Sequence, residues 1–334
     1  MTCFHPLTAY KAYSSVFDLR PEIVFSEYKA ERAAKYEKIQ LPCGQCLGCR
    51  LDYSRDWSIR CMHELKYSKD AWFITLTYDD QHLPSDLSLD PDHLRDFWKR
   101  FRKFVGSKVR YFACGEYGDR FQRPHFHSIV FFDSVQEKKL VGRLKSGFPV
   151  FNSEVLVSSW PFGYVSIANV SLNTCAYVAR YVTKKLTGKQ NDFYSESFEV
   201  DDDGVITSSF KRDFFRYPDG RIKPFCRCSR MPGLGRRFIE EFYSDVYPLD
   251  KCVFFQDGKP KSFSVPRYYD KFLETYHPEL WSDVKESRLQ KAQEISQNDD
   301  FSLDSMARRE EALISKLESH MMNKFGTSFS RKDF

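Results

Sequence analysis

The stretch His125-Phe-His-Ser-Ile-Val-Phe-Phe132 is rich in β-branched and aromatic residues and follows a run of turn residues, 115–124. This composition predicts a strand. Because side chains alternate along a strand, His125 and His127 should share one face while Phe126 points into the core. One rigid strand would then present two imidazoles side by side, an arrangement that can bind a divalent ion.

Neighbouring segments supply the rest of the expected fold. Strands are predicted at 71–78, 108–114 and 163–170, and helices near 51–68 and 153–160. A helix starting at Asp90-Pro91 would carry an apolar stripe of Leu94, Phe97, Trp98, Phe101 and Phe104. Another helix, capped by Asn173 or Thr174, would run to about Leu186. The order of these elements favours an α+β fold, a central antiparallel sheet with helices packed on one face.

Four segments are expected along the chain of 334 residues. They are a Cys-rich N-terminal segment at 1–70, a catalytic core at 71–190, a basic DNA-contacting region packed on the core at 191–282, and a helical tail at 283–334. Residues 188–209 are predicted to form a loop or hairpin.

The composition is that of a globular protein, with 42% hydrophobic and 16% aromatic residues. The net charge of +5 is small, but Lys and Arg greatly outnumber acidic residues over 204–237, and a second basic run covers 95–110. Such runs attract polyanions, although each could also be a solvated face. The predicted DNA contacts of the first run are Lys211, Arg212, Arg227, Arg230, Arg236 and Arg237.

No apolar run approaches the roughly 20 residues that a membrane span needs, and the N-terminus lacks a signal pattern. The expected location is therefore the cytoplasm, without a membrane partner. In a reducing compartment, clustered cysteines indicate a metal site.

The two histidines need a third ligand. Glu116 ends the preceding strand and could reach them from the neighbouring strand of a hairpin; Asp119 and Gln122 are alternatives. Two imidazoles and one carboxylate leave open positions for substrate and water and suit Mn²⁺ or Mg²⁺. Taken alone, a His-x-His pair is also common on exposed strands.

Tyr177 and Tyr181 lie four residues apart and should share one helix face, near Lys184 and Lys185. A separate stripe of Val178, Val182 and Leu186 could bury against the sheet, leaving the phenols available. Two half-buried structural tyrosines would show the same spacing. Chemically, a phenol can attack a phosphodiester when a metal polarises the phosphate and a lysine stabilises charge. Two phenols would permit two successive transfers.

Cys43-x2-Cys46-x2-Cys49 offers three thiolates in one tight loop. A structural zinc ion prefers four ligands, and Cys3 or His5 could supply the fourth, with Cys61 and His63 as alternatives. Zinc is favoured over an iron–sulfur cluster. Cys226-Arg-Cys228 is interpreted instead as part of a DNA-contacting loop.

In this order, the motifs resemble those of the HUH endonuclease superfamily. Phe73-Ile-Thr-Leu-Thr-Tyr78 is similar to its first motif, Arg123-Pro-His125-Phe-His127 to its metal motif, and Tyr177-x3-Tyr181-x2-Lys184-Lys185 to its nucleophile motif. The two tyrosines resemble those of initiators from small circular single-stranded DNA bacteriophages. The block Pro42-Cys-Gly-Gln-Cys-Leu-Gly-Cys-Arg50 points to the gokushovirus branch of the Microviridae. The resemblance covers about residues 40–190.

This resemblance implies an HUH-type core, a variant of the ferredoxin-like fold, that nicks the origin of the double-stranded replicative form. Tyr177 and Tyr181 would be the nucleophiles and His125 and His127 the metal ligands. The 5′ end would become linked to tyrosine, the free 3′-hydroxyl would prime the host replication machinery, and the displaced single strand would be rejoined into a circle. A non-catalytic zinc-dependent DNA-binding protein and an HUH relaxase or transposase are the rival interpretations.

Overall fold

The computed structural model describes residues 3–15, 17, 21–118, 121–144, 147–183, 216–256 and 258–325. By its contacts the chain divides into two units, Met1–Asp52 with Gln290–Phe334, and Tyr53–Leu289. The four segments expected from the sequence stay a prediction about function. Lys184, Lys185, Lys211, Arg212, Asp119 and the expected loop at 188–209 lie outside the described residues.

A seven-stranded antiparallel sheet forms the centre of the larger unit. Its strands, in spatial order, are β10 (Phe225–Cys228), β5 (Val109–Tyr117), β6 (Pro124–Phe132), β4 (Asp70–Tyr78), β9 (Gly163–Asn169), β8 (Pro149–Asn152) and β7 (Lys139–Arg143). The predicted α+β class with a central antiparallel sheet is confirmed. The hairpin of β7 and β8 was not anticipated, since its short strands carry little periodic signal.

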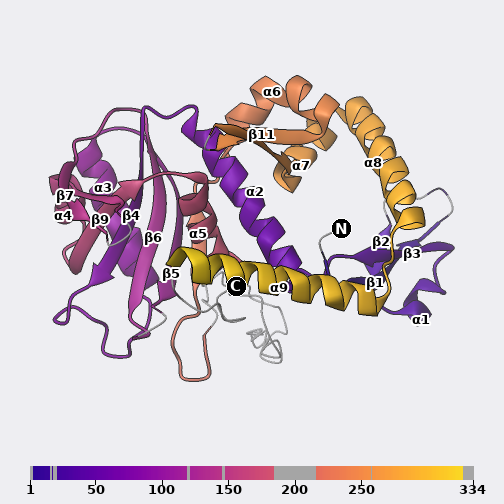
Figure 1. Ribbon diagram of the computed structural model, residues 1–334, viewed down its shortest axis with the longest axis horizontal. Helices are drawn as coiled ribbons and strands as arrows, with labels where there is room; N and C mark the ends of the chain where they lie inside the picture. Colours follow the sequence, from indigo (N-terminus) through magenta and orange to yellow (C-terminus); the bar gives the residue numbers. More distant parts are fainter. Residues whose placement is uncertain are drawn as a thin grey trace, which may run out of the picture. The chain divides into compact units, whose positions relative to one another are not determined.

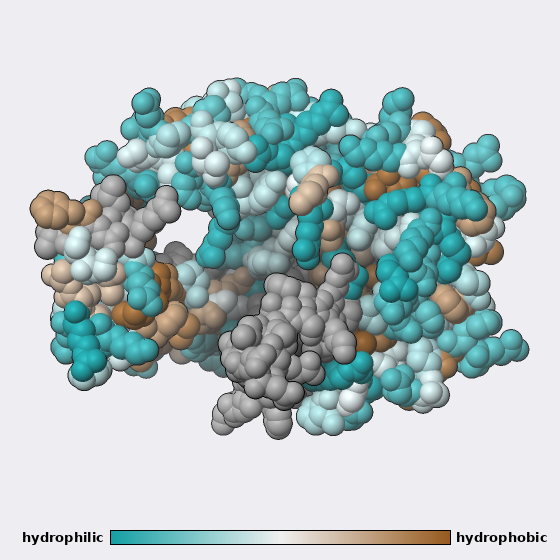
Figure 2. All heavy atoms as spheres, turned by 180° about the vertical axis from the view of Figure 1, so that it is seen from behind, coloured by the Kyte–Doolittle hydropathy of each residue, from teal (hydrophilic) through white to brown (hydrophobic). Residues whose placement is uncertain are grey.

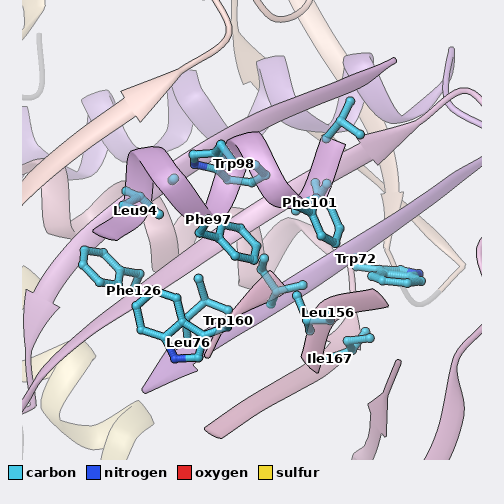
Figure 3. Close-up of a cluster of buried hydrophobic side chains, with 14 of the residues drawn as sticks. Trp72, Leu76, Leu94, Phe97, Trp98, Phe101, Phe126, Leu156, Trp160 and Ile167 are labelled. Carbon is cyan, nitrogen blue, oxygen red and sulfur yellow. The ribbon is translucent and has the colours of Figure 1, made fainter. Parts of the chain in front are cut away.

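One face of the sheet is covered by α3 (Pro91–Val105) and α4 (Glu154–Ser159). The carboxylate of Asp90 caps α3 by accepting from the backbone N–H groups of Asp92 and His93. Figure 3 shows Phe97 and Phe101 of this helix packed toward the strands, near Phe126 and Trp160. This is the main core, and alternate residues of the strands point into it.

The opposite face carries α5 (Leu172–Thr183) and part of α2 (Leu47–Leu65). Cys175, Val178 and Ala179 of α5 are fully buried against strand residues such as Ile129. Figure 1 shows α3 and α4 on one side of the sheet and α5 and α2 on the other. The expectation of helices on one face was therefore wrong, because the central strands are apolar on both faces and both need cover.

A second core lies beside α2 in the same unit. It is built from α6 (Arg236–Leu249), the hairpin β11 (Lys251–Gln256) and β12 (Lys259–Ser264), α7 (Arg267–Tyr276) and the start of α8 (Pro278–Asn298). Ile59 of α2 and Tyr269 of α7 are fully buried in it. Figure 1 shows α6, β11 and α7 grouped together.

The smaller unit combines both ends of the chain. Its sheet has the order β2 (Glu22–Val24), β1 (Leu7–Tyr13) and β3 (Lys35–Leu41), with the short helix α1 (Glu27–Ala30) beside β1. The first residues of α2 pack against α9 (Leu303–Phe325) through Leu47, Leu51, Leu313, Ile314 and Leu317. The helical character expected for 283–323 is confirmed, in two helices rather than one.

Two further expectations need correction. Phe104 does not complete the apolar stripe of α3: its side chain is 52% exposed, because the helix ends at Gly106 and its last turn extends past the core. Cys226 and Cys228 belong to the edge strand β10, paired with β5, and not to a loop. Hydrogen bonding to an existing strand outweighed the turn-forming residues around them.

Hydrophilic residues cover most of the described surface in the view of Figure 2, and apolar residues form small separate patches there. Among the described residues, no helix is both long enough and apolar enough to cross a membrane.

Phe97 and Phe104 give a matched test of this core, since both are phenylalanines on α3 but only Phe97 is fully buried. Phe97→Ala should lower the free energy of unfolding by about 3–5 kcal/mol, because it leaves a cavity. Phe104→Ala should lower it by less than about 1 kcal/mol. Denaturant unfolding followed by circular dichroism measures both changes. Equal losses would contradict the assigned orientation of α3.

Candidate functional site

Strand register brings three predicted ligands together. In the β5–β6 pair, Glu116 lies directly opposite His125. In the β6–β4 pair, Thr77 lies opposite His125 and Thr75 opposite His127. Alternation turns Phe126 into the main core, where it is fully buried, and His125 and His127 to the other face. The predicted orientation of the His-x-His strand is thus what the structure shows.

The three side chains converge on one carboxylate oxygen. Glu116 Oε1 lies 2.9 Å from His125 Nε2 and 3.0 Å from His127 Nε2. The side chains of Glu116, His125 and His127 are only 3%, 15% and 8% exposed, respectively. A carboxylate this well buried needs a compensating positive charge, since removing it from water is unfavourable.

Outer contacts fix the orientation of the two rings. His125 Nδ1 donates to the carbonyl oxygen of Arg123 at 2.9 Å, and because a carbonyl only accepts, this nitrogen must carry a hydrogen. His127 Nδ1 lies 2.9 Å from Thr75 Oγ1, and the ring of Phe73 stacks on His127 at 5.4 Å. In the neutral rings, Nδ1–H faces outward and the Nε2 lone pairs face Glu116, as in metal-binding histidines.

This donor set requires a cation. Two bare Nε2 lone pairs and a carboxylate would repel one another at 2.9–3.0 Å, so a proton or a metal ion must lie among them. Burial would raise the pKa of Glu116, but hydrogen bonds with His125 and His127 outweigh it, and the pKa lies below the ordinary value. Burial also lowers the pKa of His127, which favours the neutral imidazole that metal binding needs.

The spacing also suits a six-coordinate ion. For metal–ligand bonds of about 2.1 Å, two ligands at right angles lie about 3.0 Å apart, as both imidazole–carboxylate contacts do here. All three ligand atoms lie within 4.8 Å of one another. Glu116, His125 and His127 therefore fit a metal ion such as Mg²⁺ or Mn²⁺, as expected from the sequence.

Helix α5 places Tyr177 at this cluster. Its hydroxyl lies 3.4 Å from Glu116 Oε1, and its ring meets His127 edge to face at 5.1 Å. The helix begins earlier than predicted: Ser171 and Thr174 cap it reciprocally, each backbone N–H donating to the other's hydroxyl. Val178, one residue further, is buried, so the predicted separation of apolar stripe and phenol holds at this turn.

Other predicted residues have different positions. Tyr181 lies on α5 one turn after Tyr177, but the structure does not describe its side chain, and the alternative ligand Gln122 donates to the carbonyl of Gly118. Arg227 lies on β10 and Arg230 is exposed. Arg236 pairs with Glu240 at 2.7 Å, and Arg237 lies over the ring of Tyr67. The DNA-contacting role of these arginines stays a prediction.

The second predicted metal cluster lies in the smaller unit. The sulfurs of Cys3, Cys43, Cys46 and Cys49 all lie within 4.8 Å of one another. Of the alternative fourth ligands, His5 instead contacts Glu310 at 2.7 Å. Cys61 is fully buried, where it interacts with Cys175, and His63 stacks on Phe238, so neither is a ligand here.

Thr75 is the residue of this site that sequence analysis missed as a functional one. Its motif was noticed, but the residue facing His127 depends on the β4–β6 register, which the sequence alone does not reveal.

Thr75→Val removes the hydroxyl that orients His127 while keeping the side-chain shape. We expect it to weaken Mn²⁺ binding by about 10- to 100-fold, the usual effect of losing a hydrogen bond to a metal ligand. Thr75→Ser should retain most of the affinity. Titration of free Mn²⁺ by electron paramagnetic resonance measures this, and equal binding by the wild-type and Val proteins would argue against an orienting role.

Comparison with known proteins places this geometry in context. Residues 71–186 match a family model described as replication-associated protein ORF2, a range that begins in β4 and includes the triad and Tyr177. No solved structure matches the chain.

Three relatives extend the likeness beyond this core. Replication-associated protein VP4 of Bdellovibrio phage phiMH2K is 27% identical over 89% of this chain and 85% of its own length. Replication-associated protein ORF2 of Spiroplasma virus 4 is 26% identical over 86% of each. Replication-associated protein ORF4 of Chlamydia phage 1 is 33% identical over 52% of this chain and 43% of its own length. The chain thus belongs with the replication-associated proteins of Microviridae bacteriophages.

Proposed function

We propose that the protein is a metal-dependent DNA endonuclease and strand transferase with an HUH-type core, which starts rolling-circle replication of a small circular phage genome in the host bacterium. The relatives support a role in replication. The observation that carries the chemistry is the position of Tyr177, whose hydroxyl lies 3.4 Å from the carboxylate oxygen that also contacts both histidines.

In this proposal Glu116, His125 and His127 hold Mg²⁺ or Mn²⁺. When bound there, the ion supplies Lewis-acid polarisation of the scissile phosphate and neutralises its developing charge. The protein's own contribution is positional. Thr75 and Arg123 orient the imidazoles, and burial of Val178 and Cys175 fixes α5 so that Tyr177 faces the same point.

The first transfer is an in-line displacement at phosphorus. The phenol oxygen of a tyrosine forms a bond to phosphorus as the bond from phosphorus to the 3′ oxygen breaks. The phenol loses its proton and the departing 3′ oxygen gains one, so the products are a 5′-phosphotyrosine and a free 3′-hydroxyl. Forming phenolate at neutral pH costs about 4 kcal/mol, which explains why charge stabilisation beside the phenol is needed.

The second tyrosine would allow the reaction to repeat. After one round of synthesis by the host replication machinery, Tyr181 or Tyr177, whichever is free, would cut the regenerated origin. The new 3′-hydroxyl would then attack the first phosphotyrosine, restoring a phosphodiester and releasing a single-stranded circle. Lys184 and Lys185 are the proposed stabilisers of phosphate or phenolate charge. Lys211, Arg212, Arg227, Arg230, Arg236 and Arg237 are the proposed contacts to origin DNA.

The proposal predicts a covalent protein–DNA adduct with single-stranded or supercoiled origin DNA and Mn²⁺. The adduct should survive denaturation and be absent from the double variant Tyr177→Phe/Tyr181→Phe, which lacks both phenols. Tyr164→Phe is the matched control: this tyrosine is 70% exposed on β9, opposite Thr77, and is not on α5. Denaturing gel electrophoresis detects the adduct, and an active double variant would rule out both nucleophiles.

His125→Ala and His127→Ala separate catalysis from DNA binding. Each should abolish adduct formation while leaving the affinity for origin DNA within a few-fold of wild type, because the imidazoles hold the ion and do not contact DNA. Fluorescence anisotropy measures the affinity. A parallel loss of binding would indicate that the histidines are structural. DNA binding without any adduct in the wild-type protein would favour a non-catalytic DNA-binding protein.

A further inference from the structure

The four cysteines of the smaller unit form a second cluster, which the pairing of two strands brings together. β1 and β3 are antiparallel, and Leu7 pairs with Leu41 at the end of their ladder. Cys3 precedes this pair and Cys43 follows it, so both leave the ladder at the same end. The backbone N–H of Cys43 donates to Cys3 Sγ at 3.2 Å.

The turn between β3 and α2 directs further donors onto sulfur. Gly44 has a positive φ of 72°, which a residue with a side chain rarely adopts, and the following chain curls back. The N–H groups of Gln45 and Cys46 both donate to Cys43 Sγ, at 3.4 and 3.2 Å, and that of Phe4 donates to Cys46 Sγ at 3.3 Å. Hydrogen bonds of this kind stabilise thiolates more than thiols.

The arrangement of sulfurs suits a tetrahedral ion. Cys3 Sγ and Cys46 Sγ lie 3.9 Å apart, and all four sulfurs lie within 4.8 Å. With Zn–S bonds of about 2.3 Å, neighbouring sulfurs of a tetrahedral site lie about 3.8 Å apart. Cys49 also lies in the first turn of α2, where the helix dipole favours negative charge.

A separate observation concerns charge. Arg50 is only 8% exposed, and in the part of the chain that the structure describes, its Nε and Nη1 have no hydrogen-bond partner. A buried guanidinium is unfavourable unless negative charge lies near it. Two groups interact electrostatically with it, Cys46 and, more weakly, Glu310, which is itself in contact with His5. Four neutral thiols would leave Arg50 with little compensation.

We propose that Cys3, Cys43, Cys46 and Cys49 bind one structural Zn²⁺ and that Arg50 is the buried counter-charge of this centre. A zinc ion with four thiolates has a net charge of −2, which compensates the guanidinium where four thiols could not. The ion joins the start of β1 to the first turn of α2. The apolar contacts of Leu47 and Leu51 with α9 then connect it to the C-terminal part of the same unit.

The wild-type full-length chain gives the first test. Purified under reducing conditions with zinc present, it should contain one zinc per chain beyond any metal at the histidine triad, shown by mass spectrometry of metals in the wild-type protein and in a His125→Ala/His127→Ala variant. Replacement by Co²⁺ should give the absorption bands of a tetrahedral tetrathiolate. Absence of those bands, two disulfides among the four cysteines, or an iron–sulfur chromophore in anaerobically purified protein would each overturn the proposal.

Variants of Arg50 test the counter-charge. Arg50→Met should weaken zinc binding by about 10- to 100-fold in competition with a chromophoric chelator, as losses beside metal ligands usually do. Arg50→Lys, which keeps the charge, should recover most of the affinity. Arg308→Met, at an exposed arginine of α9, is the matched control and should bind like wild type. Zinc binding by Arg50→Met equal to that of wild type would overturn the assigned role of Arg50, whereas the cobalt spectrum tests the metal site independently.

Discussion

The contact of one buried carboxylate oxygen with two imidazoles is the constraint around which the larger unit is arranged. Glu116 Oε1 lies 2.9 and 3.0 Å from the two histidines and is almost inaccessible to water, so it is stable only with a cation beside it. The geometry requires three strands in one register, since Glu116, His125 and Thr75 come from β5, β6 and β4. A slip of one residue in β6 would turn both imidazoles into the apolar core.

The two faces of the sheet therefore have different tasks. On one face, α3 and α4 enclose an aromatic core that fixes the strands, and Phe126 belongs to it. On the other face, the same strands carry the triad, and α5 is held by small and branched residues that leave Tyr177 directed toward Glu116. Rigid packing behind the strands and a helix across their front place a phenol and a metal-ligand set within hydrogen-bonding distance.

Much of this could be predicted from the sequence, because alternation and helical spacing are local. The strand at 125–132, the orientation of its histidines and the helix that carries Tyr177 follow from such patterns. Glu116 was inferred from hairpin geometry, and the structure places it with the histidines. Pairing between distant strands could not be read from the sequence, so the role of Thr75, the edge strand at Cys226–Cys228 and the second covered face were missed. Arg50 was quoted only as part of a motif, since its burial depends on tertiary packing.

The central claim is that a tyrosine of α5 attacks phosphorus beside the Glu116–His125–His127 cluster. Tandem mass spectrometry of the peptide left attached to origin DNA after protease digestion tests this most directly, because it identifies the bonded residue. The account predicts a phosphodiester-linked nucleotide on Tyr177 or Tyr181, formed only with Mg²⁺ or Mn²⁺ present. A nucleotide attached to any other residue, or cleavage that yields free 5′-phosphate with no attached peptide, would contradict it.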